Sequence, residues 1–259
     1  MIDVAFTPSE ARAADVAVVI DVLRATTTAT QALASGYQRV LCVDSLERAL
    51  RMRATGRVLA GEQHGKRPPG FDRGNSPAEV ARDCAEELVL ATTNGAPTIV
   101  AASRECRLVI LACLLNLEAV RRQLAGADVQ IVCAGTYGAI ALEDVYVAGR
   151  LSAGLDGERT DAALAAEAVA RAHPNAYDAL AASANAKALV EAGLGDDIEF
   201  CARESLLDLV PRVERTRPGL AVAVAGPAGP VVDGAGNVRS VVEPNNPRSG
   251  RATEPQPTN

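Results

Sequence analysis

Residues 18–30 read VVIDVLRATTTAT, and the rest of the chain is organised around this stretch. An apolar run ends in Asp21, and Arg24 and a triplet of threonines follow before small and apolar residues recur at helical spacing. The pattern predicts a buried strand that leads into a helix. In open α/β sheets, ligands bind beyond the carboxyl ends of strands, where the N–H groups of a helix N-terminus suit an anion. An ordinary strand–helix turn, with Asp21 as a capping acid, is the alternative.

Asp21 adds a second requirement to such an anion site. A carboxylate repels an anion unless a cation lies between them, so the stretch indicates a divalent metal ion, with Mg²⁺ as the candidate. The guanidinium of Arg24 adds a fork of donors for the same anion.

Length and composition limit the classes of protein. The chain has 259 residues and a formal net charge of -6, which permits a sizeable core and gives no indication of a nucleic-acid surface. We also expect no membrane span, because every long apolar stretch is interrupted by charge. The N-terminus lacks the basic region of a secretory signal, so we expect a cytoplasmic protein. The six cysteines form no C-x-x-C pair and are expected to be reduced.

Apolar runs that alternate with helical patterns predict an α/β fold, a mostly parallel sheet with helices on both faces. The expected strands cover residues 2–7, 16–23, 39–43, 57–60, 88–92, 107–112, 129–133 and 198–201. The expected helices follow Asp44 and Ser76, each read as an N-terminal cap, and cover residues 117–124, 143–151, 161–192 and 204–209. We place the domain, with room for two subdomains, at residues 1–216. Residues 217–259 are Gly/Pro-rich and are expected to be a flexible, largely disordered tail, apart from an edge strand at 220–226.

Four polar turns follow four of the predicted strands, and in a parallel sheet such turns gather at one edge. Together they hold carboxylates, hydroxyl and amide donors, and cations. Carboxylates beside anion-binding donors fit a phosphate bridged by Mg²⁺. The turns contribute Asp21, Arg24, Thr26, Thr27, Thr28, Glu62, His64, Lys66, Arg67, Asp72, Thr92, Thr93, Asn94, Thr136, Glu143 and Asp144.

Several familiar motifs are incomplete. Residues 42–48 have the C-x5-R spacing of cysteine phosphatases but lack the glycines of a phosphate-wrapping loop. Residues 61–66 are one residue short of a P-loop. Leu23 stands where aspartyl-phosphate phosphatases have a second aspartate, and no G-x-G-x-x-G follows a strand. His64 is a candidate proton donor or phosphate contact, whereas His173 reads as an ordinary residue at a helix end.

The motifs in their order resemble the 2-phosphosulfolactate phosphatase family. They are VVIDVLRATTT, GFDRGNSP, TTNGA, and CAGTYG followed by LEDVYVAG, and a weaker similarity continues through residues 183–202. The resemblance implies a compact α/β fold. It also implies Mg²⁺-dependent hydrolysis of the phosphate ester of 2-phosphosulfolactate, or of a related phosphorylated 2-hydroxy acid. The products would be 3-sulfolactate and phosphate, on the route to coenzyme M.

From the resemblance and the turns we assign roles to thirteen residues. Asp21, Glu62 and Asp144 are expected to hold Mg²⁺, directly or through water. Phosphate contacts are expected from Arg24, Thr26, Thr27, Thr28, Asn94, Gly95 and Thr136. Contacts to the substrate's other anionic groups are expected from Lys66 and Arg67, and His64 is expected to bind the substrate as a phosphate contact or proton donor.

Two chemical routes and three kinds of protein remain open at this point. In one route, a water molecule that is metal-bound or deprotonated by one of the acids attacks phosphorus. In the other route, the carboxylate of Asp21 attacks phosphorus and forms a covalent intermediate. Besides a phosphatase, the same turns would serve a non-catalytic binder of small phosphorylated or sulfonated acids, or a nicotinamide-dependent dehydrogenase. We expect a small anionic substrate and no nucleic-acid or membrane partner, and we allow for a homodimer.

Overall fold

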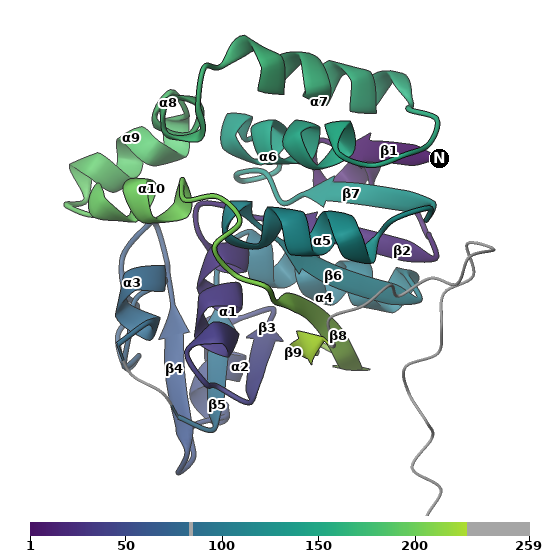
Figure 1. Cartoon of the computed structure of the whole chain (residues 1–259). Coiled ribbons are helices and arrows are strands. Elements are labelled where there is room, and N and C mark those ends of the chain that lie inside the picture. The colour runs from purple at the N-terminus through teal and green to yellow at the C-terminus, as the bar shows by residue number, and fades with distance from the viewer. Residues whose placement is uncertain (83–84, 227–259) are drawn as a thin grey trace, which may run out of the picture.

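The structure is a computed structural model, and it describes residues 1–82 and 85–226 (Figure 1). Within these residues, nine strands form a single sheet in the order β1-β7-β2-β6-β8-β9-β3-β5-β4. The strands are β1 (Ile2–Ala5), β2 (Val16–Ile20), β3 (Arg39–Val43), β4 (Arg57–Gly61), β5 (Glu87–Ala91), β6 (Leu108–Ala112), β7 (Val129–Cys133), β8 (Val210–Arg217) and β9 (Leu220–Gly226). The fold is of the α/β class and its sheet is mostly parallel, as predicted.

Helices fill most of the connections between the strands. The α-helices are α1 (Ala25–Ala34), α2 (Leu46–Arg51), α3 (Pro77–Val80), α4 (Gly95–Glu105), α5 (Leu117–Gln123), α6 (Leu142–Ala153), α7 (Asp161–Ala172), α8 (Ala176–Ala181), α9 (Ala184–Glu191) and α10 (Asp196–Cys201). Two short 3-10 helices are η1 (Pro8–Glu10) and η2 (Leu114–Asn116). In the part of the chain that the structure describes, no helix is both long and apolar enough to cross a membrane.

The sheet consists of two parallel groups joined by a hairpin. Strands β1, β7, β2 and β6 form one group, and β3, β5 and β4 form the other. Between them lies the β8–β9 hairpin, which is antiparallel to β6 on one side and to β3 on the other. Figure 1 shows β7 and β4 running in different directions. We had predicted that the turns share the edge of one continuous parallel sheet. This prediction is wrong, because the antiparallel hairpin separates the two parallel groups.

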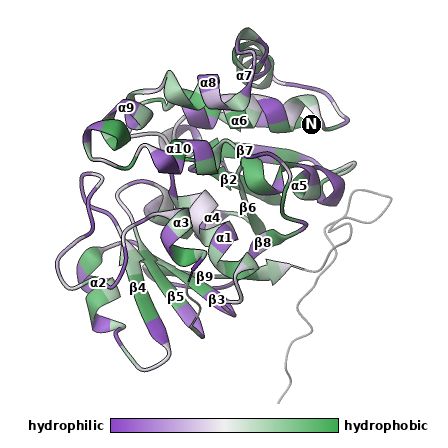
Figure 2. Ribbon diagram, turned by 60° about the vertical axis from the view of Figure 1, so that its left-hand side comes forward, coloured by the Kyte–Doolittle hydropathy of each residue, from purple (hydrophilic) through white to green (hydrophobic). Residues whose placement is uncertain are grey.

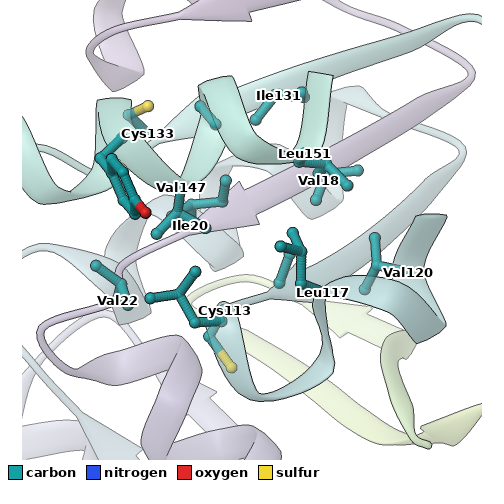
Figure 3. Packing of buried hydrophobic residues seen from close by; sticks show 14 of the residues in the cluster. Val18, Ile20, Val22, Cys113, Leu117, Val120, Ile131, Cys133, Val147 and Leu151 are labelled. Carbon is teal, nitrogen blue, oxygen red and sulfur yellow. The ribbon is translucent and has the colours of Figure 1, made fainter. Parts of the chain in front are cut away.

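Strand β2 lies inside the first group, and its successive residues contribute to different hydrophobic clusters. Val18 and Ile20 pack in a cluster with residues of α5 and α6, whereas Val19 packs in a second cluster with residues of α1 and α4. This alternation follows from the two-residue period of a strand. Figure 3 shows the first cluster, with Val18 beside Leu151 of α6 and Ile20 beside Val147 of the same helix. Because both sides are buried, β2 reads as a continuous apolar run rather than an alternating one.

The hydropathy of the chain follows this layout. Figure 2 shows hydrophobic residues on the strands, with hydrophilic residues on loops and outer helix surfaces. A third cluster, around Leu59 and Phe71, lies against the second parallel group.

The C-terminal third differs from the predicted elements in three places. Residues 198–201, expected as a strand, belong to α10, whose first turn is acidic and whose Ile198 and Cys201 are buried at helical spacing. Residues 204–209 form no helix, because Ser205 adopts a left-handed conformation and donates its amide to the carbonyl of Leu114. The predicted edge strand is β9, and it lies inside the sheet, beyond the domain boundary that we placed at residue 216.

The long helical pattern at 161–192 is divided into α7, α8 and α9. Each begins at its own cap, where the side chain of Thr160, Asn175 or Ser183 accepts a hydrogen bond from a backbone amide. The cap of α2 is Ser45 rather than Asp44, which instead forms an ion pair with Arg48. The helix after Ser76 ends at Val80, short of the end near residue 84 that we had predicted, and the tail from residue 227 lies outside the described residues.

Candidate functional site

A cavity of about 230 Å³ lies where turns from both parallel groups meet. The turn after β2, the loop after β4, and the turns after β5 and β7 all contribute, and α9 closes one side. The lining residues are Asp21, Leu23, Arg24, Glu62, His64, Gly65, Asn75, Thr93, Asn94, Thr136, Tyr137, Asn185, Ala188 and Leu189. Six residues that we had predicted for the site therefore line one cavity together: Asp21, Arg24, Glu62, His64, Asn94 and Thr136.

Asp21 is held at the start of α1. Its Oδ1 accepts a hydrogen bond of 3.0 Å from the amide of Ala25, the first helical residue. Only 7% of Asp21 is exposed. Among the described residues, Oδ1 accepts this hydrogen bond and Oδ2 accepts none, so Oδ2 is available to bind a ligand.

Gly95, the first residue of α4, packs directly against Asp21. A Cβ atom at this position would lie 2.3 Å from Oδ2 of Asp21 and 2.5 Å from Cβ of Ala25. Only glycine allows the two helix starts to approach this closely. Residues at both N-cap positions, Arg24 and Asn94, line the cavity, so the positive ends of two helices of ten and eleven residues meet there.

Arg24 is fixed by a buried ion pair. Its Nη1 donates to Oδ2 of Asp197 at 2.6 Å, and each residue is only 3% exposed. The hydroxyl of Ser76 donates to the other oxygen of Asp197 at 2.7 Å. Thus α10 and the segment before α3 together orient the guanidinium at the wall of the cavity.

Glu62 connects the loop after β4 to the turn after β5. Its Oε1 accepts from the amide of Thr93 at 2.7 Å, and its Oε2 accepts from the amide of Gly65 at 2.9 Å. The carboxylate thus orders two walls of the cavity while remaining in its lining.

The opposite wall is formed by the turn after β7. The side-chain oxygen of Asn94 accepts from the amide of Tyr137 at 3.0 Å, and Nδ1 of His64 lies 3.1 Å from the hydroxyl of Tyr137. Asn185 on α9 donates to the hydroxyl of Thr136 at 2.6 Å and also to the carboxylate of Glu143. These bonds tie four separate segments together around the cavity.

Asp144 lies behind the cavity rather than in its lining. Its two oxygens accept from the amides of Val22, at 2.9 Å, and of Gly135, at 3.1 Å. It is 2% exposed. The residue that we had predicted as a metal ligand therefore joins the turn after β2 to the turn after β7.

Burial dominates the electrostatics of this acidic region. Burial, with added repulsion from the nearby carboxylates of Glu62 and Glu143, raises the pKa of Asp21 to about 7. Burial also raises the pKa of Glu143, and it raises the pKa of Asp144 well above its usual range, with added repulsion from Glu143 and Asp21. Crowded acids of this kind favour a cation among them.

The carboxylates of the cavity meet part of what a Mg²⁺ ion requires. Among residues 1–82 and 85–226, no three His, Cys, Asp or Glu side chains are arranged to hold a metal ion by themselves. Mg²⁺ commonly takes one or two carboxylates and completes its shell with water and substrate phosphate. Asp21, through its available Oδ2, and Glu62 in the same lining fit that smaller requirement.

The threonine triplet serves the protein's interior. Thr26, Thr27 and Thr28 are fully buried and do not line the cavity. Their hydroxyls donate to the backbone carbonyls of Asp21, Val22 and Asn75, respectively. The predicted phosphate contacts from these hydroxyls are therefore not formed.

The predicted cations of the long loop also point elsewhere. Lys66 and Arg67 are exposed and do not line the cavity, and Arg67 donates to the carbonyl of Asp72 at 3.3 Å. The side chain of Asp72 accepts from the amide of Leu59 and pairs with Arg53, 3.0 Å away. The loop folds back on itself between Arg67 and Asp72. The position of these residues shortly after β4 in the sequence does not predict this fold.

Sequence reasoning assigned no role to Asn75, Tyr137, Asn185 or Asp197. A signal for them existed, because Asn75 lies in the GFDRGNSP motif and Asn185 and Asp197 lie in the weaker similarity at residues 183–202.

The chain is similar in sequence to proteins of one family. Residues 4–216 match the family model described as 2-phosphosulpholactate phosphatase. A protein of Thermus thermophilus named probable 2-phosphosulfolactate phosphatase is 43% identical over 217 residues, covering 80% of this chain and 91% of the relative. Proteins with the same name are 39% identical in Thermotoga petrophila, covering 82% of this chain and 94% of the relative, and 40% identical in Deinococcus radiodurans, covering 76% and 87%.

Proposed function

Since the chain belongs to the 2-phosphosulpholactate phosphatase family, we propose that it hydrolyses the phosphate ester of 2-phosphosulfolactate to 3-sulfolactate and phosphate. A closely related phosphorylated 2-hydroxy acid is the alternative substrate of the same reaction. The observation that carries the proposal is the meeting of Arg24 and two helix N-termini with the carboxylates of Asp21 and Glu62 in one cavity. The cavity thus combines hydrogen-bond donors that can bind a phosphate with carboxylates that can accept a proton.

The phosphate is bound by Arg24 and attracted by the positive dipole ends of α1 and α4. Asp197 holds the guanidinium of Arg24, so little side-chain freedom is lost when the substrate binds. Fixed donors of this kind also stabilise the charge that shifts on the phosphoryl oxygens in the transition state. Thr136 and Asn185 close the far side, where the substrate's other anionic groups would lie.

Asp21 is the residue we assign to proton transfer. A pKa of about 7 lets its carboxylate accept a proton from water near neutral pH. Glu62 keeps the neighbouring loops in place through Thr93 and Gly65. In the alternative route, bound Mg²⁺ held by Asp21 and Glu62 would neutralise the phosphate and lower the pKa of water at the site, and Asp21 would then stay ionised as a ligand.

One experiment tests this function. Phosphate release is measured from 2-phosphosulfolactate, phospholactate and phosphoglycerate, each with Mg²⁺ and with EDTA. We expect fast, Mg²⁺-dependent release from the sulfonate. Release only from another acid would keep the reaction and change the substrate, whereas binding without any release would identify a non-catalytic binder.

A second measurement distinguishes the two chemical routes. Excess enzyme is allowed a single turnover in ¹⁸O-labelled water. Label in the released phosphate supports direct attack by water, and unlabelled phosphate supports a covalent intermediate on Asp21.

A further inference from the structure

Helix α9 forms a wall of the cavity that the proposed chemistry does not use. Asn185, Ala188 and Leu189 line the cavity, and a spacing of three and four residues places them on one face of the helix. Ala188 is exposed, and its single methyl group leaves open space next to Asn185. This face therefore offers an amide side chain, a buried leucine and room for a substituent of the substrate.

Glu143 is a buried carboxylate that holds the first turn of α9. It lies in the first turn of α6 and is 2% exposed. Its carboxylate accepts a hydrogen bond from the side-chain amide of Asn185 and another from the side chain of Ser183, the N-cap of α9. A buried carboxylate needs such partners, and the two bonds fix the start of α9 against α6. The place of Asn185 in the cavity wall follows from this contact.

The hydroxyl of Thr136 has a hydrogen atom available for a ligand. Nδ2 of Asn185 donates to Oγ1 of Thr136 at 2.6 Å, and a hydroxyl that accepts one hydrogen bond still has its own proton to donate. None of the described residues accepts that proton. The turn itself is closed by two backbone hydrogen bonds between Thr136 and Ala139, each 2.9 Å long, so it does not need the hydroxyl. Thr136 is half-buried and lines the cavity, where a ligand provides the acceptor.

The orientation of Asn185 keeps Thr136 in this role. The carboxylate of Glu143 accepts hydrogen bonds, so it requires the nitrogen rather than the oxygen of the Asn185 amide. The same nitrogen then faces Thr136, whose hydroxyl can only accept from Asn185. The proton of Thr136 is thereby kept for the ligand.

An anionic group of the substrate fits this arrangement. The oxygens of ionised phosphate, carboxylate and sulfonate groups only accept hydrogen bonds, so each can pair with a hydroxyl donor. Phosphate and carboxylate are common to all phosphorylated 2-hydroxy acids. 2-Phosphosulfolactate differs from phospholactate by a sulfonate in place of one hydrogen atom, and the open space next to Ala188 admits this bulky group. The donor and the open space together favour the sulfonate.

We propose that α9 selects the substrate by its sulfonate. The hydroxyl of Thr136 donates to a sulfonate oxygen, Asn185 orients that hydroxyl, and Glu143 holds Asn185 in place. Thr136 is therefore a binding contact, whereas Asn185 and Glu143 are positioning residues. The inference rests on the proposed function, to which it adds the residues that distinguish 2-phosphosulfolactate from acids without a sulfonate.

The first test compares Thr136→Val, which loses the hydroxyl, with Thr136→Ser, which keeps it. Phosphate release is measured from 2-phosphosulfolactate and from phospholactate, and we expect the wild type to prefer the sulfonate at least tenfold in kcat/KM. In Thr136→Val the KM for 2-phosphosulfolactate should rise about tenfold, because a hydrogen bond to a charged group is lost. The KM for phospholactate and the inhibition constant of inorganic phosphate should change less than twofold, and Thr136→Ser should keep the wild-type preference.

The positioning role of Asn185 is tested with a double variant. Asn185→Leu has a similar size but no donor, and it should reduce the preference for the sulfonate about as much as Thr136→Val. The variant with both changes should lose no more than either single variant, because the two residues act through one contact. Thermal melting is the folding control, and Asn185→Ala replaces Asn185→Leu if the latter does not fold.

The space on the face of α9 is tested with two alanines of the same helix. Ala188→Leu fills the room next to Asn185, and we expect kcat/KM for 2-phosphosulfolactate to fall at least about tenfold, with a smaller fall for phospholactate. Ala184→Leu is the matched control, because Ala184 is exposed and does not line the cavity, and it should leave both values unchanged.

Four outcomes would overturn the inference. An unchanged preference in Thr136→Val would show that the hydroxyl does not bind the sulfonate, and tenfold weaker inhibition by inorganic phosphate would make Thr136 a phosphate contact. Losses that multiply in the double variant would show that Asn185 does not act through Thr136. A wild-type protein that hydrolyses phospholactate or phosphoglycerate as fast as 2-phosphosulfolactate, or instead of it, would have no sulfonate site. Failure of the proposed function is different, because the wild type would then release phosphate from none of these acids.

Discussion

Arg24 and Asp197 form a buried ion pair, 2.6 Å long, across 173 positions of the sequence. Asp197 lies on α10, among the small helices of the C-terminal third, whereas Arg24 follows the central strand β2. The pair therefore makes the late helices part of the site. Because each partner is almost fully buried, each charge depends on the other for its stabilisation.

Replacing Asp197 with Asn should weaken both stability and substrate binding. The change leaves the Arg24 charge buried without a counter-charge, and breaking such a pair costs about 3–5 kcal/mol. We expect a lower melting temperature and a raised KM, because the guanidinium loses its fixed orientation. Asp196→Asn, one position earlier and exposed, is the matched control and should leave both quantities unchanged. If the two variants have the same melting temperature and the same KM, Asp197 has no role in the site.

Asp21→Asn should change how stability depends on pH. The pKa of Asp21 is raised to about 7 in the folded protein, above the value of about 4 expected in the unfolded chain. The folded state thus binds the proton more tightly and loses stability as pH rises from about 4 to 7. Removing the titrating group removes that loss.

The melting temperature of Asp21→Asn, relative to the wild type, should therefore rise between pH 5 and pH 8. Calorimetry in EDTA measures this difference without a bound cation, and the linkage limits it to about 3 kcal/mol over this pH range. The variant should also lose most of its phosphatase activity. A constant difference across this pH range, with near wild-type turnover, would make Asp21 an ordinary capping residue.

Thr27→Val separates a structural role from a binding role. The hydroxyl of Thr27 donates to the carbonyl of Val22 at 2.8 Å and lies outside the cavity. Valine keeps the shape but leaves that carbonyl unpaired, at a cost of about 1–3 kcal/mol. We expect urea unfolding to show this loss while kcat and KM stay within about twofold. A large rise in KM at unchanged stability would instead support the substrate contact predicted from the sequence.

Gly95→Ala should disturb the site through packing alone. The new methyl group would lie 2.3 Å from Asp21, whose other oxygen is fixed to α1. We expect about 1–3 kcal/mol of destabilisation and a lower kcat/KM. Gly195→Ala is the control, because its Cβ would meet only Val190, at 3.6 Å, and should change stability by less than about 0.5 kcal/mol. Denaturant unfolding and steady-state kinetics of the two variants test the difference.

Local patterns were sufficient to predict most of the fold. The apolar runs at β2, β6 and β7 are properties of neighbouring residues. The position of β9 is different in kind. The run LAVAVAG predicts a strand, but its place between β8 and β3 depends on long-range pairing that no local pattern contains.

The site shows the same division. Asp21, Arg24, Glu62 and Asn94 follow strands, and the sequence predicted their gathering, but two parallel groups joined by a hairpin bring them together rather than one continuous parallel sheet. The direction of a side chain was not predictable. Thr26 and Asp144 have the right chemistry and the right neighbours, yet their polar atoms are committed to backbone partners. Asn185 and Asp197 reach the site from helices far along the chain.

The β8–β9 hairpin has a consequence for biosynthesis. It is the last described part of the chain to leave the ribosome, and it pairs with β6 on one side and β3 on the other. Until it emerges, each of these strands presents an unpaired edge, which is a template for association with another chain. A nascent polypeptide that stalls before Val210 would contain two parallel groups of strands, each with an unpaired edge open to other chains. The final hairpin therefore completes the sheet and also protects the new chain from aggregation.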